Sequence, residues 1–330
     1  MRTVLADVRP WRHDLAGCLH ASAATLLAFH GVPPLDALGA AWGFYYPPAD
    51  SRGEEYYFPC PPGRSLLGSL APYHPVWSRW HQPADAADGW AQVRGLVAAG
   101  QPAAVAVDNF HLPFRPAYRD VHANHLIVVY GFDDARGTVR VLDAVPPRFD
   151  GDIRITELTA ARDSGNLAVH DRDMFFAGRP IGNRWLEVGA GQPEPPSRDR
   201  VRDHIRRNVT GFAGAAPHQG LAGLRAFLGA AQTRLAAGLQ VADELFIVAG
   251  AALATSALHA DWLTACGRGF GEPGWTELGR QVERVAHHWS AVRIMAALSR
   301  SGAVSADRLR RRHRALLDDI QRVLAEMAEI

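Results

Sequence analysis

Residues 124–144 read NHLIVVYGFDDARGTVRVLDA, in which two apolar runs are joined by a short polar turn. The runs HLIVVY and TVRVL are rich in β-branched residues, which favour strands. The segment DARG between them ends in glycine and is typical of a turn. We therefore predict an antiparallel hairpin in which His125 and Asp143 lie nearly opposite each other on one face of the sheet.

Patterns before the hairpin complete an α+β fold. The residues after Cys18 have apolar side chains at helical spacing as far as His30, where GVPP stops the helix. Residues 35–42 and 90–99 predict two further helices, and PAAVAV at 102–107 predicts another strand. We therefore expect helices packed on an antiparallel sheet.

A second, mainly α-helical region is expected beyond residue 200. Residues 189–200 are rich in proline, glycine and charged side chains and are typical of a linker. Apolar residues then recur at helical spacing to the C-terminus, with a glycine-rich loop expected at 267–274. We expect two domains, over residues 1–190 and 200–330.

The composition excludes several classes of protein. The chain has 330 residues, 48% of them hydrophobic, and a formal net charge of +1, so no global field attracts it to nucleic acid or membrane. Three cysteines are too few for a disulfide framework and indicate a reducing compartment. The most apolar run, residues 245–260, is shorter than the ~20 residues that a membrane span needs. We predict a soluble cytoplasmic protein with neither nucleic acid nor membrane as partner.

Cys18 falls in the first turn of the predicted N-terminal helix. Unsatisfied backbone N–H groups and the helix dipole favour a thiolate there. A nucleophilic thiolate also needs a base and a group that orients the base. His125 and Asp143 follow in the chain order of papain-like enzymes. We predict Cys18 as nucleophile, His125 as base and Asp143 as the residue that orients His125.

Local sequences around these residues resemble the butirosin biosynthesis protein H family. The resemblance covers most of residues 11–190 and implies a papain-like N-terminal domain, with the helical region as the C-terminal domain often attached. The matching stretches are GCLHASAATLLAFHGV at 17–32, GFY at 43–45, PGR at 62–64, NHLIVVYGFDD at 124–134 and VLDA at 141–144.

This resemblance implies an acyltransferase of natural-product biosynthesis that forms amide bonds. Such an enzyme takes an acyl group from the phosphopantetheine thioester of an acyl or peptidyl carrier protein and passes it to a small-molecule amine. The acyl group would pass through a Cys18 acyl-enzyme, with His125 and Asp143 in the roles given above. The only cofactor implied is the phosphopantetheine that the carrier protein brings.

Two other functions stay open. A cysteine peptidase or thioesterase would use the same triad with water as the acceptor. A catalytically inactive papain-like scaffold would only bind carrier proteins or peptides, and one departure favours it: no glutamine precedes Cys18 to donate to the oxyanion. The oxyanion would instead need the Cys18 backbone N–H and a second donor, Arg12 or His13.

An aromatic-rich segment and the loop before the hairpin supply candidate substrate-binding residues. The loop side chains, Arg115 among them, suit a polar acyl group or acceptor, although such residues are equally common in ordinary loops. No metal site is expected, because residues 122 and 125 fall on opposite faces of a strand. The predicted substrate-binding residues are Tyr45, Tyr46, Asn109, Phe110, His122 and Asn124.

Residues 308–314 carry a run of arginines that has two interpretations. The run is either a solvated helix face or a docking surface for an acidic carrier protein. In the second interpretation Arg308, Arg311 and Arg312 contact the carrier. Of the remaining cysteines, Cys60 is expected in a loop or a cleft wall, and Cys266 is expected to be structural.

Overall fold

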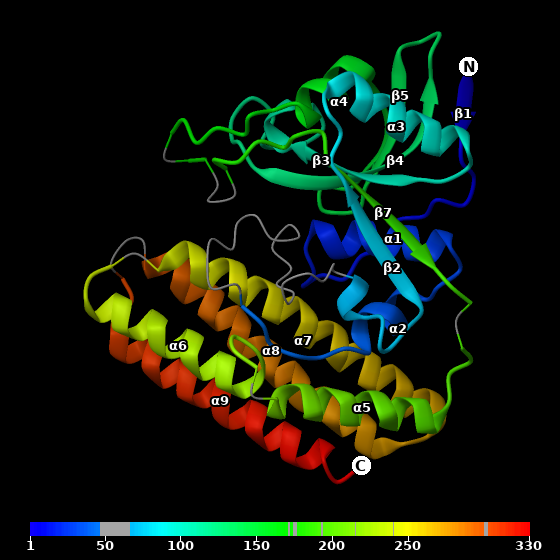
Figure 1. The fold of residues 1–330 in the computed structure, drawn as a ribbon. Coiled ribbons are helices and arrows are strands. Elements are labelled where there is room, and N and C mark those ends of the chain that lie inside the picture. The colour runs from blue at the N-terminus through cyan, green and yellow to red at the C-terminus, as the bar shows by residue number, and fades with distance from the viewer. Residues whose placement is uncertain are drawn as a thin grey trace. The chain divides into compact units, whose positions relative to one another are not determined.

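The computed structural model resolves the chain into two compact units (Figure 1). The sheet unit comprises residues 1–13, 18–34 and 76–191, and the helical unit comprises residues 14–17, 35–75 and 192–330. The expected division into domains 1–190 and 200–330 stays a prediction. The residues that the structure describes are 1–46, 67–170, 172–173, 177–192, 194–214, 216–239, 241–299 and 303–330.

The described part of the sheet unit contains a seven-stranded sheet whose strand pairs are all antiparallel. The order is β2-β7-β3-β4-β5-β6, and β1 also pairs with β4. This sheet confirms the α+β class. The strands are β1 (Arg2–Val4), β2 (Val76–His81), β3 (Ala103–Asp108), β4 (Asn124–Asp133), β5 (Thr138–Asp143), β6 (Phe149–Arg154) and β7 (Trp185–Ala190).

Helices cover this sheet from two sides. Helices α3 and α4 pack on the face that carries Ile127 and Val129, where they share one apolar core with β3, β4 and β5. Helix α1 lies on the other side (Figure 1), and the Ser22 hydroxyl donates to the Leu126 carbonyl of β4 at 3.4 Å. The helical segments of this unit are α1 (Cys18–Phe29), α3 (Ala86–Ala98), η4 (Asn109–His111) and α4 (Ile155–Arg162).

The predicted hairpin forms, but its register is not the symmetrical one. The turn already pairs Asp133 with Thr138, and a bulge between Val129 and Gly131 then shifts the pairing by one residue, so that Val128 lies opposite Leu142. Asp143 is therefore a diagonal neighbour of His125 rather than its direct partner. Diagonal positions share a face of the sheet and are within reach of long side chains, so the two residues still meet.

Two long helices, α7 and α8, form the centre of the helical unit. A Cβ on Gly267 would overlap the Thr276 hydroxyl, so glycine permits the close packing of α7 on α8. The loop expected at 267–274 is therefore wrong in its first part: α7 continues until Gly271, whose φ of +68° ends it. The helical segments of this unit are α2 (Pro34–Gly39), η3 (Leu67–Ser69), α5 (Arg198–Ala213), α6 (Gly220–Ala236), α7 (Ala242–Phe270), α8 (Pro273–Ser299) and α9 (Ala306–Met327).

The segment that follows α2 belongs to the core of this helical unit. Phe44 stacks on Trp289 with ring centroids 5.8 Å apart. The Trp42 indole N–H donates to the Ser256 hydroxyl at 3.1 Å, and the side chains of Trp42 and Phe44 are buried. These contacts tie residues 40–46 to helices that begin more than 150 positions later in the chain.

Helix α7 is also long and apolar enough, by length and composition alone, to cross a membrane, and it is the one such helix among the described residues. Its most apolar window is 72% buried inside the protein. That burial is typical of the core helix of a soluble protein.

Candidate active site

The thiol of Cys18 lies at the first position of α1 and is partly exposed. It hydrogen-bonds to the His125 side chain and accepts the backbone N–H of Leu126. Burial raises the pKa of this thiol, but the hydrogen bond and the charge of His125 outweigh burial, so the pKa lies below its usual value. Cys18 is therefore held in a form that favours the nucleophilic thiolate.

His125 stands between this thiol and a carboxylate. Its ring is buried at the start of β4, and its Nε2 lies 2.7 Å from Oδ2 of Asp143. Burial lowers the pKa of His125, but the charge and hydrogen bond of Asp143, together with Cys18, raise it to about 9. At neutral pH the imidazole therefore carries a proton, and its charge favours the thiolate form of Cys18.

Asp143 ends β5 and is only 1% exposed. Its Oδ1 accepts the backbone N–H of Val145 at 2.9 Å, and its Oδ2 accepts Nη1 of Arg115 at 3.1 Å. Burial raises the pKa of Asp143, but His125, Arg115 and the Val145 amide together lower that pKa by more than burial raises it. The carboxylate therefore stays ionised. The predicted triad of Cys18, His125 and Asp143 thus meets in space as one hydrogen-bonded chain.

Arg115 is the member of this chain that sequence reasoning missed. The sequence suggests Arg115 for substrate recognition. In the structure its Nη1 donates to Asp143 and to the carbonyl of Val145 at 3.1 Å. The four side chains therefore follow one another as the sulfur of Cys18, the imidazolium of His125, the carboxylate of Asp143 and the guanidinium of Arg115. Groups that favour negative charge thus alternate with cationic groups. No pattern in the sequence marks this pairing, because a loop of irregular structure brings Arg115 to Asp143.

Replacing Arg115 by methionine is expected to destabilise the protein by about 3 kcal/mol, because it leaves a buried carboxylate without one of its two cationic partners. Arg115→Lys should restore part of this stability. Urea unfolding at pH 7 measures the effect, with Arg119→Met as the matched control, since Arg119 is an exposed arginine of the same loop. An equal loss in the Arg119 variant would contradict this assignment.

Three of the predicted substrate-binding residues form a polar group beside the triad, at the start of β4. The Nδ1 atom of His122 lies 2.7 Å from Oδ2 of the buried Asp108. The ring of Phe110 stacks on that of His122 with centroids 4.1 Å apart. Asn124 accepts Nδ2 of Asn166 at 2.8 Å. Their contact with a substrate stays a prediction.

Of the other predicted substrate-binding residues, Asn109 adjoins this group, because its backbone N–H donates to the carbonyl of Ala123 at 3.0 Å. Asn109 opens η4 in the sheet unit. Tyr45 and Tyr46 belong to the helical unit, where the ring of Tyr46 packs on Phe227 with centroids 5.1 Å apart. Their role in binding substrate also stays a prediction.

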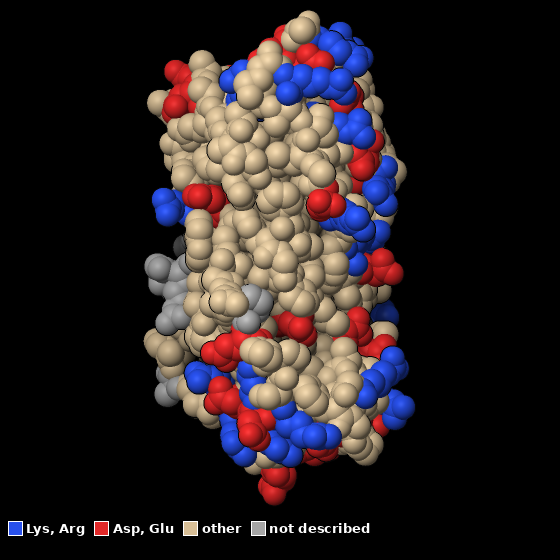
Figure 2. Space-filling view, turned by 90° about the vertical axis from the view of Figure 1, so that its right-hand side faces the viewer, with Lys and Arg blue, Asp and Glu red and all other residues tan. Residues whose placement is uncertain are grey.

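The arginine run lies on α9. Arg308 and Arg311 are exposed, whereas Arg312 donates to Nδ1 of His288 on α8 at 3.1 Å. Figure 2 shows another face of the molecule, on which blue Lys or Arg side chains lie beside red Asp and Glu side chains. Docking of a carrier protein at these arginines stays a prediction.

The two remaining cysteines differ from Cys18. Burial raises the pKa of Cys266 to about 12, which keeps that thiol protonated and unreactive. Cys60 lies outside the described residues. Among the described residues, no group of three or more His, Cys, Asp or Glu side chains is arranged to hold a metal ion.

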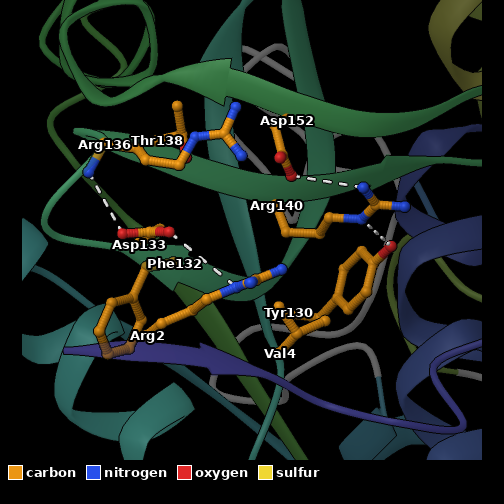
Figure 3. A pocket seen from close by; sticks show the side chains of 9 residues that line it. All are labelled: Arg2, Val4, Tyr130, Phe132, Asp133, Arg136, Thr138, Arg140 and Asp152. Atoms are coloured by element: carbon orange, nitrogen blue, oxygen red, sulfur yellow. Dashed lines mark hydrogen bonds and ion pairs between the residues drawn. The ribbon is translucent and has the colours of Figure 1, made fainter.

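A separate pocket of about 240 Å³ lies toward the opposite end of β4 (Figure 3). Most of its charged groups are paired with one another. Arg140 donates to the hydroxyl of Tyr130 at 2.9 Å and lies 3.4 Å from Asp152, and Arg2 lies 3.9 Å from Asp133. The pocket contains neither Cys18 nor His125, so it is distinct from the cysteine site.

Comparison with known proteins agrees with the resemblance described above. Residues 17–144 match the family model described as butirosin biosynthesis protein H, N-terminal. The matched segment begins one residue before Cys18, includes His125 and ends one residue after Asp143. A search of curated proteins finds no match for this chain.

Proposed function

Residues 17–144 of this chain belong to the butirosin biosynthesis protein H N-terminal family, and from this membership we propose a cysteine-dependent acyltransferase of natural-product biosynthesis. The enzyme would take an acyl group from the phosphopantetheine thioester of a carrier protein and pass it to an amine in the cytoplasm. The observation that carries the proposal is the continuous hydrogen-bonded chain from the Cys18 thiol through His125 to Asp143.

The first step loads the acyl group onto the enzyme. The Cys18 thiolate attacks the thioester carbonyl, a new carbon–sulfur bond forms, and the bond to the pantetheine sulfur breaks. The His125 imidazolium gives its proton to the departing thiolate. The step exchanges one thioester for another, so it needs neither ATP nor a metal ion.

The second step transfers the acyl group to the acceptor. The amine nitrogen attacks the Cys18 thioester carbonyl, a carbon–nitrogen bond forms, and the bond to the Cys18 sulfur breaks. The now neutral His125 accepts a proton from the attacking nitrogen, which restores the thiolate–imidazolium pair. The Cys18 backbone N–H, at the N-terminus of α1, would donate to the oxyanion, with Arg12 or His13 as the proposed second donor.

Intact-mass measurement of the acyl-enzyme tests the proposal. Incubation with an acylated carrier protein should add one acyl mass to the wild-type chain and none to Cys18→Ala, with Cys266→Ala as the matched control. The sequence contains 35 arginines and no lysine, so no lysine amine can capture the acyl group and confuse the result.

The same experiment separates the rival functions. Adding an amine should convert the acyl-enzyme to an amide. Release of free acid at the same rate with and without amine would instead identify a peptidase or thioesterase. A wild-type chain that gains no acyl mass would indicate the inactive binding scaffold.

A further inference from the structure

In the proposed function, on which this inference rests, His125 must lose and regain one proton in each cycle. Its imidazolium gives a proton to the departing pantetheine thiolate, and its neutral ring then accepts a proton from the attacking amine. A buried carboxylate beside the ring opposes the first transfer, because an opposite charge favours the protonated imidazole. The negative charge that Asp143 directs at His125 therefore affects both steps.

A single oxygen atom of Asp143 binds two cationic side chains. Its Oδ2 lies 2.7 Å from Nε2 of His125 and accepts Nη1 of Arg115 at 3.1 Å. Its Oδ1 accepts the backbone N–H of Val145 at 2.9 Å. The backbone amide therefore anchors the carboxylate through one oxygen, while His125 and Arg115 share the negative charge of the other.

The surrounding chain holds the guanidinium of Arg115 at this oxygen. Its Nη1 also donates to the carbonyls of Val145 at 3.1 Å and Pro146 at 3.4 Å, and only 11% of the Arg115 side chain is exposed. The backbone N–H of Arg115 donates to the carbonyl of the buried Leu112 at 3.0 Å. Val145 thus binds both partners, Asp143 through its N–H and Arg115 through its carbonyl, which fixes the guanidinium beside the carboxylate.

The charged groups that act on this arrangement come from three parts of the sheet unit and from Asp143 itself. Asp143 faces His125 of β4 and Arg115 of the loop before β4, and His125 faces Asp143 and Cys18 of α1. Burial lowers the pKa of His125, but Asp143 and Cys18 raise it to about 9. Arg115 is therefore the cation that offsets the charge of Asp143 without itself exchanging a proton in the reaction.

We propose that Arg115 is a positioning residue for proton transfer: by sharing Oδ2 of Asp143, its guanidinium limits how firmly the carboxylate holds the proton of His125. Without this cation, the full charge of the anchored carboxylate acts on the imidazolium. The ring then gives its proton less readily to the pantetheine thiolate, and less of it is neutral when the amine attacks. Arg115 acts on the reaction only through Asp143.

Titration of His125 in the full-length Arg115→Gln variant tests this role. Glutamine keeps an N–H donor but removes the charge, so the pKa of His125 should rise by about one unit. NMR of histidine-labelled protein measures this pKa after iodoacetamide has blocked Cys18, so that the thiolate does not contribute. Arg115→Lys, which keeps the charge, should return the pKa toward its wild-type value. Arg119→Gln, which alters an exposed arginine of the same loop, is the matched control.

The kinetics of amide formation provide a second measurement. With one amine, transfer from the preformed acyl-enzyme at pH 7 should be about tenfold slower in Arg115→Gln than in the wild type, because one pKa unit leaves about one tenth as much neutral ring. The deficit should disappear above the pKa of His125 in both proteins. A deficit of the same size at every pH would instead indicate displaced side chains and would contradict the proposal.

The remaining outcomes also decide the role of Arg115. An unchanged or lowered pKa of His125 in Arg115→Gln, or an equal rise in Arg115→Lys, would overturn it. If the glutamine variant does not fold, the wild type decides: the side-chain N–H signals of Arg115 should titrate with the midpoint of His125, since both groups bind one oxygen, and constant signals would overturn the role. The NMR titration needs no substrate, so absence of an acyl-enzyme in the wild type would overturn the proposed function separately.

Discussion

Replacing His125 by alanine is expected to reduce acyl transfer by about 10⁴-fold, because the site loses both its general base and the cation that stabilises the Cys18 thiolate. Burial and the nearby Asp143 charge, which raise the pKa of the thiol, would then be opposed only by the hydrogen bond from the Leu126 backbone N–H. The pH at which Cys18 becomes reactive should therefore move upward as activity is lost.

Alkylation by iodoacetamide measures this second effect independently of any substrate. Wild-type Cys18 should be labelled readily near pH 6, whereas Cys18 of the His125→Ala variant should react only at alkaline pH. Peptide mass analysis identifies the labelled thiol, and His287→Ala is the matched control because the His287 side chain is 73% exposed. Labelling at pH 6 that does not depend on His125 would show that the imidazole does not maintain the thiolate.

Acidification below pH 6.5 is expected to destabilise the protein strongly, well before its carboxylates are protonated. Five histidines are held neutral inside the fold, and in each case burial is the main cause of a pKa lowered from 6.5 to about 4. They are His20, His74, His204, His259 and His313.

The sign of this effect follows from proton binding. Between pH 6.5 and 4 the unfolded chain binds protons at these rings and the folded chain does not, so their stabilisation is complete above pH 6.5 and is lost as the pH falls toward 4. A shift of this size corresponds to about 3 kcal/mol for one fully buried ring. Two or three such rings are comparable to the whole stability of a domain, about 5–15 kcal/mol. His125, with its raised pKa, acts in the opposite sense: its stabilisation is complete below pH 6.5 and is lost as the pH rises toward 9.

Urea unfolding at pH 7.5, 6 and 5 measures this loss as a falling free energy of unfolding. His259 is fully buried and its Nδ1 lies 2.7 Å from the carbonyl oxygen of Gly39. In a His259→Gln variant the free energy of unfolding should fall less steeply with decreasing pH, because unfolding takes up one proton fewer than in the wild type. A free energy of unfolding that stays constant from pH 7.5 to 5 would contradict the assignment of these histidines as neutral and buried.

The parts of the fold that local sequence determines were predictable. The helix expected from Cys18 to His30 is observed over Cys18–Phe29, and the strands on both sides of the polar turn form the expected hairpin. Strand β2 and strand β7 were not predicted. They pair with each other across about 100 residues, and β2 mixes buried and exposed positions without a clear alternation.

The residues of the candidate site were predictable where their types and their order along the chain follow a known catalytic pattern. A cysteine at a helix start, a histidine at a strand start and an aspartate at a strand end gave Cys18, His125 and Asp143, which the structure brings together. The residues that hold their partners in place, Arg115 and Asp108, lie where loops of irregular path converge. Such convergence depends on tertiary packing and has no local pattern.

The route of the chain limits how the protein can be divided. After helix α1 the chain leaves the sheet unit, places Trp42 and Phe44 in the core of the helical unit, and then returns to the sheet unit at β2. A fragment that ends near residue 190 would carry these two aromatic rings without the helices that bury them. Expression of residues 1–190 alone would therefore yield an aggregation-prone product, and an engineered fusion should keep the helical unit in the same polypeptide.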